Sequence, residues 1–283
     1  FKPADLVPGC GWVLADIVAR AGLPDGVFNL VMGRGSIVGE TLVNHPDVAG
    51  ISFTGSVETG HHVAARGVSR MAIALDGSFF ATGQRCTASS RLIVTEGIHD
   101  RFVAAMTDAL GKLTVDDALA DGTQIGPVVD QSQLDIDLSY IEVGRKEGAT
   151  LAYGGALLDR AQKGFYLQPA LFTDTTNDMR VNREEIFGPV ATVLRAKDYD
   201  QALALANDTE FGLSSGICTT SLKHASHFKR HAEAGMVMVN LPTAGVDYHV
   251  PFGGRKGSSY GPREQGRYAA EFYTTVKTAY TQP

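Results

Sequence analysis

The sequence predicts an α/β fold built on parallel β-sheets. Short apolar strands, glycine-containing turns and amphipathic helices alternate along the chain, which is the pattern of parallel strands joined by crossover helices. The length of 283 residues is enough for one large or two ordinary domains. A composition with 44% hydrophobic and 20% charged residues is ordinary for a soluble globular protein.

The first part of the chain predicts two strand–turn–helix repeats after an opening helix. That helix runs from about Val7 to Ala21, and Gly22 and Pro24 end it. The elements expected next are a strand Val27–Val31, a helix capped by Ser36 and reaching Asn44, a strand Gly50–Phe53 and a helix near Thr59.

The alternation continues in the longer second part. Strands are expected at Arg91–Val94, Pro189–Leu194, Ser215–Cys218 and Met236–Asn240. Helices are expected at His99–Leu113, Asp130–Glu147, Tyr199–Asn207 and Leu222–Ala234. The last apolar alternation, Thr275–Tyr280, predicts an edge strand that pairs with another subunit.

Charge and cysteine content narrow the class of protein. The net charge is −6 without a basic block, so neither nucleic acid nor an anionic membrane is an expected partner, and no apolar run is long enough to span a bilayer. The cysteines Cys10, Cys86 and Cys218 form neither a metal-ligand spacing nor a disulfide framework, which favours a reducing cytoplasm. The abrupt start at Phe1, without an initiator Met or a signal peptide, is typical of the middle of a protein.

One cysteine has a setting that favours chemistry. Most lone cysteines are buried small hydrophobes. Cys86, however, follows a glycine turn and the polar pair Gln84-Arg85, and it precedes a predicted helix. That placement can expose the sulfur and favour its thiolate through the helix N-terminus and Arg85.

Two glycine loops can bind phosphate. The strand ending in Phe53-Thr54-Gly55-Ser56 can offer backbone N–H groups to a pyrophosphate. Gly33-Arg34-Gly35 with Gly39 approaches a dinucleotide-binding fingerprint, but its third glycine comes one residue late. Taken alone, each loop is more typical of an ordinary strand-to-helix turn.

Taken together and in order, a set of segments resembles the aldehyde dehydrogenase superfamily. These segments are Phe1–Asp5, Ala21–Pro24, Gly26–Asn29, Phe53–Ser56, Gly83–Cys86, Glu184–Pro189, Asn207 with Gly212-Leu213, and Pro251–Lys256. The resemblance implies two Rossmann-type parallel-sheet domains, one for the cofactor and one catalytic, and a C-terminal oligomerisation strand. Residues 1–75 would be part of the NAD(P)-binding domain, 76–260 the catalytic domain, and 261–283 a return helix and the oligomerisation strand.

The same resemblance implies a role for particular residues. Cys86 falls on the family's nucleophile, which forms a thiohemiacetal and then a thioester. Cofactor-binding positions fall on Lys2, Ala4, Asp5, Gly35, Phe53, Gly55, Ser56, Thr59, Glu185 and Phe187. Lys2 and Asp5 would hold the adenosine ribose, and a carboxylate there favours NAD, while the short Asp side chain leaves NADP open. Glu185 and Phe187 would position the nicotinamide ribose and ring; alone, Glu184-Glu185 would indicate a solvated helix start.

The chain departs from the family pattern in two places. The family's segment with the glutamate that activates the hydrolytic water is absent, and by comparison roughly two dozen residues are missing at the Met71–Ala72 join. The asparagine that completes the oxyanion hole is also not among these residues. We therefore expect that a chain truly joined in this way could not turn over.

The C-terminal part, Pro242–Gly266, resembles the α-ketoglutarate semialdehyde (2,5-dioxopentanoate) dehydrogenase branch of the family. An aldehyde that carries a carboxylate calls for an arginine in its tunnel. Arg85 and Phe252 are the candidate substrate residues, although Arg85 can equally serve packing or cysteine activation. His249 is a loop or wall residue in this interpretation, and no metal is expected.

Three alternatives stay open. The first is a semialdehyde dehydrogenase of another kind, including a CoA-acylating one, since the CoA-acylating enzymes lack the water-activating glutamate. A cysteine hydrolase would use Cys86 with His249 and need no nicotinamide. A non-catalytic protein would keep only the fold. A homodimer or homotetramer is the expected assembly, and the sequence distinguishes neither the two assemblies nor NAD from NADP.

Overall fold

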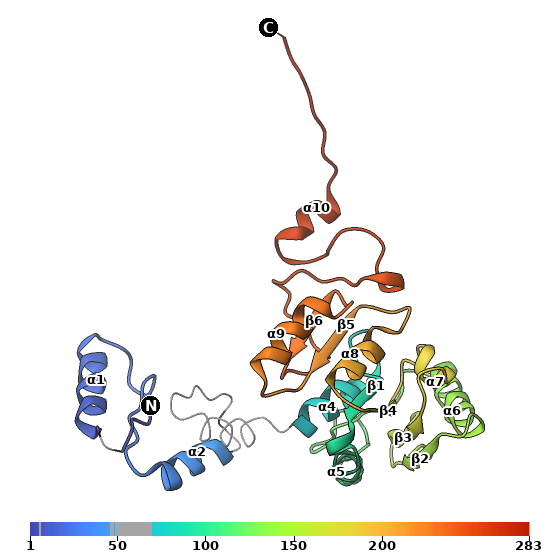
Figure 1. The fold of residues 1–283 in the computed structure, drawn as a ribbon, viewed down its shortest axis with the longest axis horizontal. Helices are drawn as coiled ribbons and strands as arrows, with labels where there is room; N and C mark the ends of the chain where they lie inside the picture. Colours follow the sequence, from blue (N-terminus) through green and yellow to red (C-terminus); the bar gives the residue numbers. More distant parts are fainter. Residues whose placement is uncertain (6, 46–47, 49–69, 283) are drawn as a thin grey trace. The chain divides into compact units, whose positions relative to one another are not determined.

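The computed structural model describes residues 1–5, 7–45, 48 and 70–282 (Figure 1). The chain divides into two compact units, Phe1–Ser69 and Arg70–Pro283, and each is described here by itself. The predicted strand Gly50–Phe53 and the helix near Thr59 lie outside the described residues.

The first unit begins with the predicted helix. Helix α1 spans Pro8–Arg20, with proline in its first turn and Gly22 just beyond its end at a φ of +82°. A π-helical turn, Gly35–Gly39, then leads directly into α2, Glu40–Asn44. The predicted cap at Ser36 is wrong, because Arg34 takes the N-cap position and Ser36 lies inside the first turn.

The predicted strand Val27–Val31 is also not formed. The amino group of Phe1 donates to the carbonyl of Asn29 at 2.6 Å, and the Val31 N–H donates to the carbonyl of Phe1 at 2.9 Å. These two bonds pair Phe1 with the segment Asn29–Val31 at one position only, which is too short for a regular strand. The apolar run therefore stays extended without joining a sheet in the described part of this unit.

Apolar side chains on α1 remain in contact with solvent. Trp12 is 61% exposed, Val13 49% and Ile17 51%. Only Gly11 of this helix is buried, because its backbone lies against the ring of Pro3. The face of α1 that carries the amphipathic pattern is thus uncovered within the described residues of the first unit.

The second unit contains a mixed four-stranded sheet in the order β1-β4-β3-β2. The strands are β1 Arg91–Thr95, β2 Thr150–Tyr153, β3 Ala170–Thr175 and β4 Val190–Ala196. Strands β1, β4 and β3 are parallel, with Leu92 opposite Val193 and Phe172 opposite Thr192, whereas β2 runs antiparallel to β3. Sequence inspection predicted β1 and β4 and missed β2 and β3.

A second, smaller sheet pairs two further strands. Strand β5, Ser214–Ile217, runs parallel to β6, Met236–Val239, with Ser214 opposite Met236. Both strands lie where the alternation of apolar residues predicted them. A parallel pair needs a crossover connection, and helix α9 supplies it, Leu222–His231.

Four helices follow the prediction with small differences at their ends: α5 His99–Gly111, α6 Gln131–Lys146, α8 Tyr199–Asn207 and α9. The second unit also contains α4 Arg70–Phe79, α7 Arg180–Arg183 and α10 Ala269–Tyr273, for which the sequence analysis gave no bounds. Asp130 caps α6 by accepting the Gln133 N–H at 2.9 Å, and Ser221 caps α9 by accepting the His224 N–H at 3.2 Å. Helix α9 ends at His231, three residues before the predicted Ala234.

The core of the second unit has two parts. Side chains from β1, β4 and β3 pack with α4 and α5 in one cluster, which includes Leu92, Val94, Leu171, Val193, Phe79, Met106 and Leu110. The alternate residues Ala170 and Phe172 of β3 pack in a second cluster with Ile141 of α6. Because neighbouring residues of a strand point to opposite faces, the two clusters lie on opposite sides of the sheet.

The predicted edge strand Thr275–Tyr280 pairs with no strand in the described part of the second unit (Figure 1). It follows α10 as an extended segment, with Val276 99% and Tyr280 95% exposed. A strand needs a neighbour for its backbone N–H and C=O groups. Its pairing with another subunit stays a prediction.

Among the described helices, none is long and apolar enough to cross a membrane.

Candidate active site

Cys86 lies on a tightly folded loop that follows helix α4. After Phe79, which is fully buried, Ala81, Thr82 and Gly83 all have positive φ angles of 54° to 65°. This left-handed turn reverses the chain, and Cys86 then stands exposed to solvent. The expected helix after Cys86 is wrong: the chain runs on through a turn into β1, so no helix N-terminus follows the sulfur.

The reason for the extended course after Cys86 is visible in its contacts. Thr87 is buried, and the Ser89 N–H donates to the carbonyl of Gly77 in α4 at 2.8 Å. After Cys86 the chain therefore runs back along the end of α4, the helix that precedes the cysteine loop. A helix starting at Thr87 would break both the burial and this hydrogen bond.

Polar side chains fix both ends of the cysteine loop. Before Cys86, Thr82 donates through Oγ1 to the carbonyl of Gly126 at 3.2 Å, and Gln84 accepts the Val129 N–H through Oε1 at 3.0 Å. After it, Ser214 of β5 donates to the carbonyl of Thr87 at 3.3 Å. Two hydroxyls, Ser89 Oγ and Thr243 Oγ1, lie 2.6 Å apart. The loop is thus held to the segment before α6 on one side and to β5 on the other, while Cys86 itself stays accessible.

The segment Glu185–Phe187 lies beyond the end of α7. Ile186 is buried, whereas Glu185 and Phe187 on either side of it are exposed, which is the alternation of an extended segment. Glu184 pairs with Arg180 at 2.9 Å and accepts the Tyr140 hydroxyl at 2.7 Å. The Arg180 guanidinium, followed by the Tyr140 hydroxyl, lowers the pKa of Glu184. The glutamate pair thus ends a helix and does not start one.

The cysteine loop and the Glu185–Phe187 segment meet at two glycines. A Cβ on Gly83 would lie 2.3 Å from the carbonyl oxygen of Gly188, far inside contact distance. The contact depends on the missing side chain and on the positive φ of Gly83. The second unit thereby brings the loop that carries the expected nucleophile into contact with the end of the segment expected to position the nicotinamide.

The expected ribose-binding residues lie together in the first unit. Lys2 Nζ pairs with Asp5 Oδ1 at 2.7 Å, and the Gly35 N–H donates to Asp5 Oδ2 at 3.2 Å. The Lys2 hydrogen bond, followed by that of Gly35, lowers the pKa of Asp5. This cluster borders a surface hollow whose lining residues are Pro3, Ala4, Asp5, Pro8, Met32, Gly33 and Arg34. The expected pyrophosphate residues Phe53, Gly55, Ser56 and Thr59 lie outside the described residues.

The two expected substrate residues differ in their surroundings. Arg85 is exposed and forms no ion pair with another described residue. Phe252 is half-buried, and it exchanges two backbone hydrogen bonds with Glu264, at 2.6 Å and 2.8 Å. His249 is exposed, with its ring against Tyr248. No group of three or more metal-ligating side chains is found in the described ranges.

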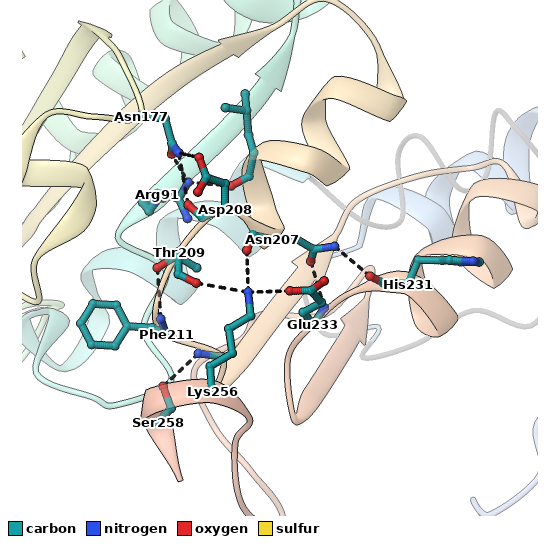
Figure 2. Close-up of polar contacts among 12 residues, drawn as sticks. Arg91, Asn177, Asn207, Asp208, Thr209, Phe211, His231, Glu233, Lys256 and Ser258 are labelled. Atoms are coloured by element: carbon teal, nitrogen blue, oxygen red, sulfur yellow. Dashed lines mark hydrogen bonds and ion pairs between the residues drawn. The ribbon is translucent and has the colours of Figure 1, made fainter.

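A lysine that sequence reasoning gave no role anchors the loop that carries Phe252. Figure 2 shows the Lys256 ammonium among three oxygens: the carbonyls of Asn207 at 2.5 Å and Thr209 at 3.1 Å, and Glu233 Oε2 at 2.7 Å. Asn207 in turn accepts the Glu233 N–H through Oδ1 at 2.9 Å. The ends of α8 and α9 are thus joined to the C-terminal loop. In the sequence, the only indication of a role for Lys256 is its place at the end of the family segment Pro251–Lys256, just before Gly257.

Comparison with known proteins identifies the class to which this fold and this loop belong. The profile of the aldehyde dehydrogenase family matches residues 1–73 and 69–279, and the chain therefore belongs to the aldehyde dehydrogenase family. The two matched stretches meet where the sequence predicts a missing segment at Met71–Ala72; the break itself stays a prediction.

Curated relatives match the chain over its whole length. It is 38% identical to the alpha-ketoglutaric semialdehyde dehydrogenase of Bacillus subtilis, covering 100% of this chain and 64% of the relative. It is 39% identical to the 2,5-dioxopentanoate dehydrogenase of Saccharolobus solfataricus, with 99% and 64% covered. It is 40% identical to the betaine aldehyde dehydrogenase of Brucella anthropi, with 100% and 63% covered. The chain thus spans slightly less than two thirds of the length of these relatives.

Solved structures confirm the α/β fold class. HpcC from Thermus thermophilus is 36% identical with a TM-score of 0.69, over 98% of this chain and 59% of that one. An NAD-dependent aldehyde dehydrogenase from Sinorhizobium meliloti is 34% identical with a TM-score of 0.70, over the same shares. The betaine aldehyde dehydrogenase of Staphylococcus aureus in complex with NAD+ is 30% identical with a TM-score of 0.69, over 96% and 59%.

Proposed function

We propose that the protein containing this chain oxidises an aldehyde to a carboxylic acid, with Cys86 as the nucleophile and NAD or NADP as the acceptor. The observation that carries the proposal is the exposed Cys86 on a loop fixed on both sides and in contact, through Gly83 and Gly188, with the Glu185–Phe187 segment. Family membership supports the same chemistry.

The chemistry of the site follows from the sulfur. Cys86 Sγ, as thiolate, attacks the aldehyde carbon and forms a thiohemiacetal. Loss of hydride from that carbon leaves a thioester on Cys86, and water hydrolyses the thioester to release the acid and the thiolate. When bound, the nicotinamide accepts the hydride. The loop, fixed on both sides, holds Cys86 in one place through all three steps, which lowers the entropic part of the barrier.

The residues of the first unit fit a dinucleotide. Lys2 and Asp5 present a donor and an acceptor beside a surface hollow, which suits the two hydroxyls of a ribose. The Asp5 carboxylate disfavours a 2′-phosphate and supports NAD. Arg34 lines the same hollow, so its positive charge can offset that repulsion toward NADP.

For the substrate we propose 2,5-dioxopentanoate, which would yield 2-oxoglutarate. Two of the relatives carry names that include this activity. Arg85 adjoins the nucleophile with no anionic partner among the described residues, so its guanidinium is available to a substrate carboxylate. A relative named betaine aldehyde dehydrogenase raises a second substrate, but betaine aldehyde is a cation, which Arg85 would repel. Phe252 stays a proposed substrate contact.

The setting of the enzyme is part of the same proposal. We infer a cytoplasmic homodimer or homotetramer that acts in sugar-acid breakdown. The exposed, extended segment 275–280, with Val276 and Tyr280 open to solvent, supports pairing with another subunit. The general base and the oxyanion asparagine would come from residues outside this sequence.

Steady-state kinetics of the full-length enzyme test the proposal. The substrates are 2,5-dioxopentanoate, succinic semialdehyde, propionaldehyde and betaine aldehyde, each with NAD and with NADP, and reduced nicotinamide is followed by its absorbance. We expect the highest kcat/KM for 2,5-dioxopentanoate. Arg85→Gln should raise its KM by about tenfold and leave propionaldehyde nearly unchanged. Arg101→Gln, an exposed arginine on α5, is the matched control.

Three results would contradict the proposal. Absence of nicotinamide reduction with every aldehyde excludes a dehydrogenase, and ester hydrolysis by Cys86 in its place indicates a cysteine hydrolase. A requirement for CoA indicates an acylating enzyme. An Arg85→Gln variant that loses activity equally with charged and neutral aldehydes excludes the carboxylate role of this residue.

A further inference from the structure

A carboxyl group that the proposed chemistry does not use is buried behind the active-site loops. Asp137, on helix α6, is 0% exposed. Its Oδ1 accepts one hydrogen bond, from Gln133 Nε2 at 2.8 Å, and its Oδ2 has no partner among the described residues. A carboxyl group removed from water with one of its two oxygens unpartnered costs free energy in the folded state, so its position calls for an explanation.

Asp137 lies directly against the turn that follows Glu185. A Cβ on Gly188 would lie 2.0 Å from Asp137 Oδ1 and 2.4 Å from Oδ2, so the carboxyl group occupies the space that a side chain at Gly188 would need. Gln133 Nε2 donates to the carbonyl of Ile186 at 2.8 Å as well as to Asp137. Helix α6 therefore contacts the turn on both sides of Phe187, whose φ is +64°.

No charged or titratable group around Asp137 bonds to it within the described ranges. Those on its own helix and on the packed elements α7, the following loop, β2 and β3 are Asp135, Tyr140, Glu142, Arg145, Lys146, Arg180, Arg183, Glu184, Glu185, Tyr153 and Asp174. None of them forms a hydrogen bond or an ion pair with Asp137 within the described ranges, while Arg180 binds Glu184 and Arg145 binds Glu142. An ionised Asp137 would have no counter-charge in contact with it in the part of the chain that the structure describes.

We propose that Asp137 is a positioning residue for the Ile186–Gly188 turn, and that the charge on its carboxyl group sets how firmly helix α6 holds Glu185 and Phe187. The inference rests on the proposed function, because it assigns these two side chains to the cofactor. Neutral, the carboxyl group packs against Gly188 at a much lower desolvation cost than the ionised form. Ionised, it favours water entry or displacement of the turn.

The titration of Asp137 falls in a range where the effect can be measured. Burial raises the pKa of Asp137 to about 6, and the Gln133 hydrogen bond opposes the shift. The group is therefore mainly neutral at pH 5 and ionised at pH 8. Asp137→Asn keeps the shape and removes the charge at both values.

Hydrogen exchange on the full-length enzyme tests the proposal without catalysis. Exchange of the peptide that contains Ile186–Gly188 is compared at pH 5 and pH 8 after correction for the intrinsic rate. We expect protection in the wild type to fall by about tenfold at pH 8 and protection in Asp137→Asn to stay constant. Asp135→Asn, exposed on the same helix, should behave as the wild type. Equal pH dependence in wild type and Asp137→Asn would overturn the inference, as would a wild type without pH dependence.

A kinetic measurement separates this inference from the proposed function. The ratio of the KM for NAD in wild type to that in Asp137→Asn should be near one at pH 5 and rise several-fold at pH 8, with little change in the KM for the aldehyde. A merely structural role would not give this dependence. If no aldehyde is oxidised but the exchange result holds, the proposed function fails and the anchoring of the turn stands.

Discussion

Gly83 and Gly188 are in backbone contact across the two loops of the active site. A Cβ on Gly83 would lie 2.3 Å from the carbonyl oxygen of Gly188, and one on Gly188 would lie 2.0 Å from Asp137 Oδ1. Three layers, the cysteine loop, the Glu185–Gly188 segment and helix α6, are thus stacked with no room for a methyl group between them. The geometry of Cys86 depends on this packing.

Gly83→Ala should separate the two loops. The new methyl group would both strain a φ of +65° and clash with the carbonyl of Gly188, for a combined loss of about 2–4 kcal/mol in unfolding free energy. Catalytic rate should fall by at least about tenfold, because Sγ moves. Gly148→Ala is the matched control, since its φ is +92° and nothing lies within 4 Å of its added Cβ. Equal destabilisation by both variants, measured by urea unfolding, would mean that the contact contributes little.

Cys86→Ser should abolish aldehyde oxidation. A serine hydroxyl is a far weaker nucleophile than a thiolate, so we expect kcat to fall by at least about a thousandfold. All three cysteines of this chain are exposed, so Cys10→Ser and Cys218→Ser are suitable controls. Both should keep near-normal kcat. Iodoacetamide should inactivate the controls and wild type alike, and substrate should slow that inactivation.

Cofactor preference should depend on the charges around Asp5. Asp5→Ala removes the acceptor for the ribose and the repulsion toward a 2′-phosphate, so KM should rise for NAD and fall for NADP, each by several-fold. Arg34→Ala should raise the KM for NADP alone. Arg20→Ala, an exposed arginine on α1, controls for surface charge. Identical changes in both cofactors for Asp5→Ala and Arg34→Ala would exclude this division of roles.

Asp137 should make folding stability depend on pH with a definite sign. Its folded-state pKa, about 6, exceeds the ordinary value of 3.8, so the folded protein binds this proton more tightly than the unfolded chain does. The contribution is complete below about pH 4 and is lost as pH rises through 6. Asp137→Asn should therefore gain about 1–2 kcal/mol relative to wild type between pH 5 and pH 8. Urea unfolding of both proteins at the two pH values measures it, and a constant difference would contradict a titrating Asp137.

Elements with a strong local pattern could be predicted from the sequence. Helix α8 was predicted at its observed bounds, Tyr199–Asn207, from its sequence pattern, and the structure adds that Asp198 caps it. Strands β1, β4, β5 and β6 were found within one or two residues at each end. Strand β2 was missed because it has only four residues, Thr150–Tyr153, at the edge of the sheet, and none of the four is buried. Strand β3 is buried on both faces, and its short run lacks alternation.

The site was predictable in its residues but not in its contacts. Cys86 stood out through a family motif, yet the helix expected after it is not formed, because Thr87 is buried and its carbonyl accepts a hydrogen bond from Ser214 of β5. Asp137 gave no signal, since an aspartate in an amphipathic helix is normally solvated. Only the fold reveals that it faces Gly188 and that Lys256 joins the ends of two helices.

The exposed face of α1 also provides an optical probe. Trp12 is the only tryptophan among the 283 residues, and its indole is 61% exposed. Its fluorescence emission in this chain therefore reports one location, the α1 surface, without any label. A shift of that emission to shorter wavelength on mixing with another polypeptide would signal that α1 has become covered.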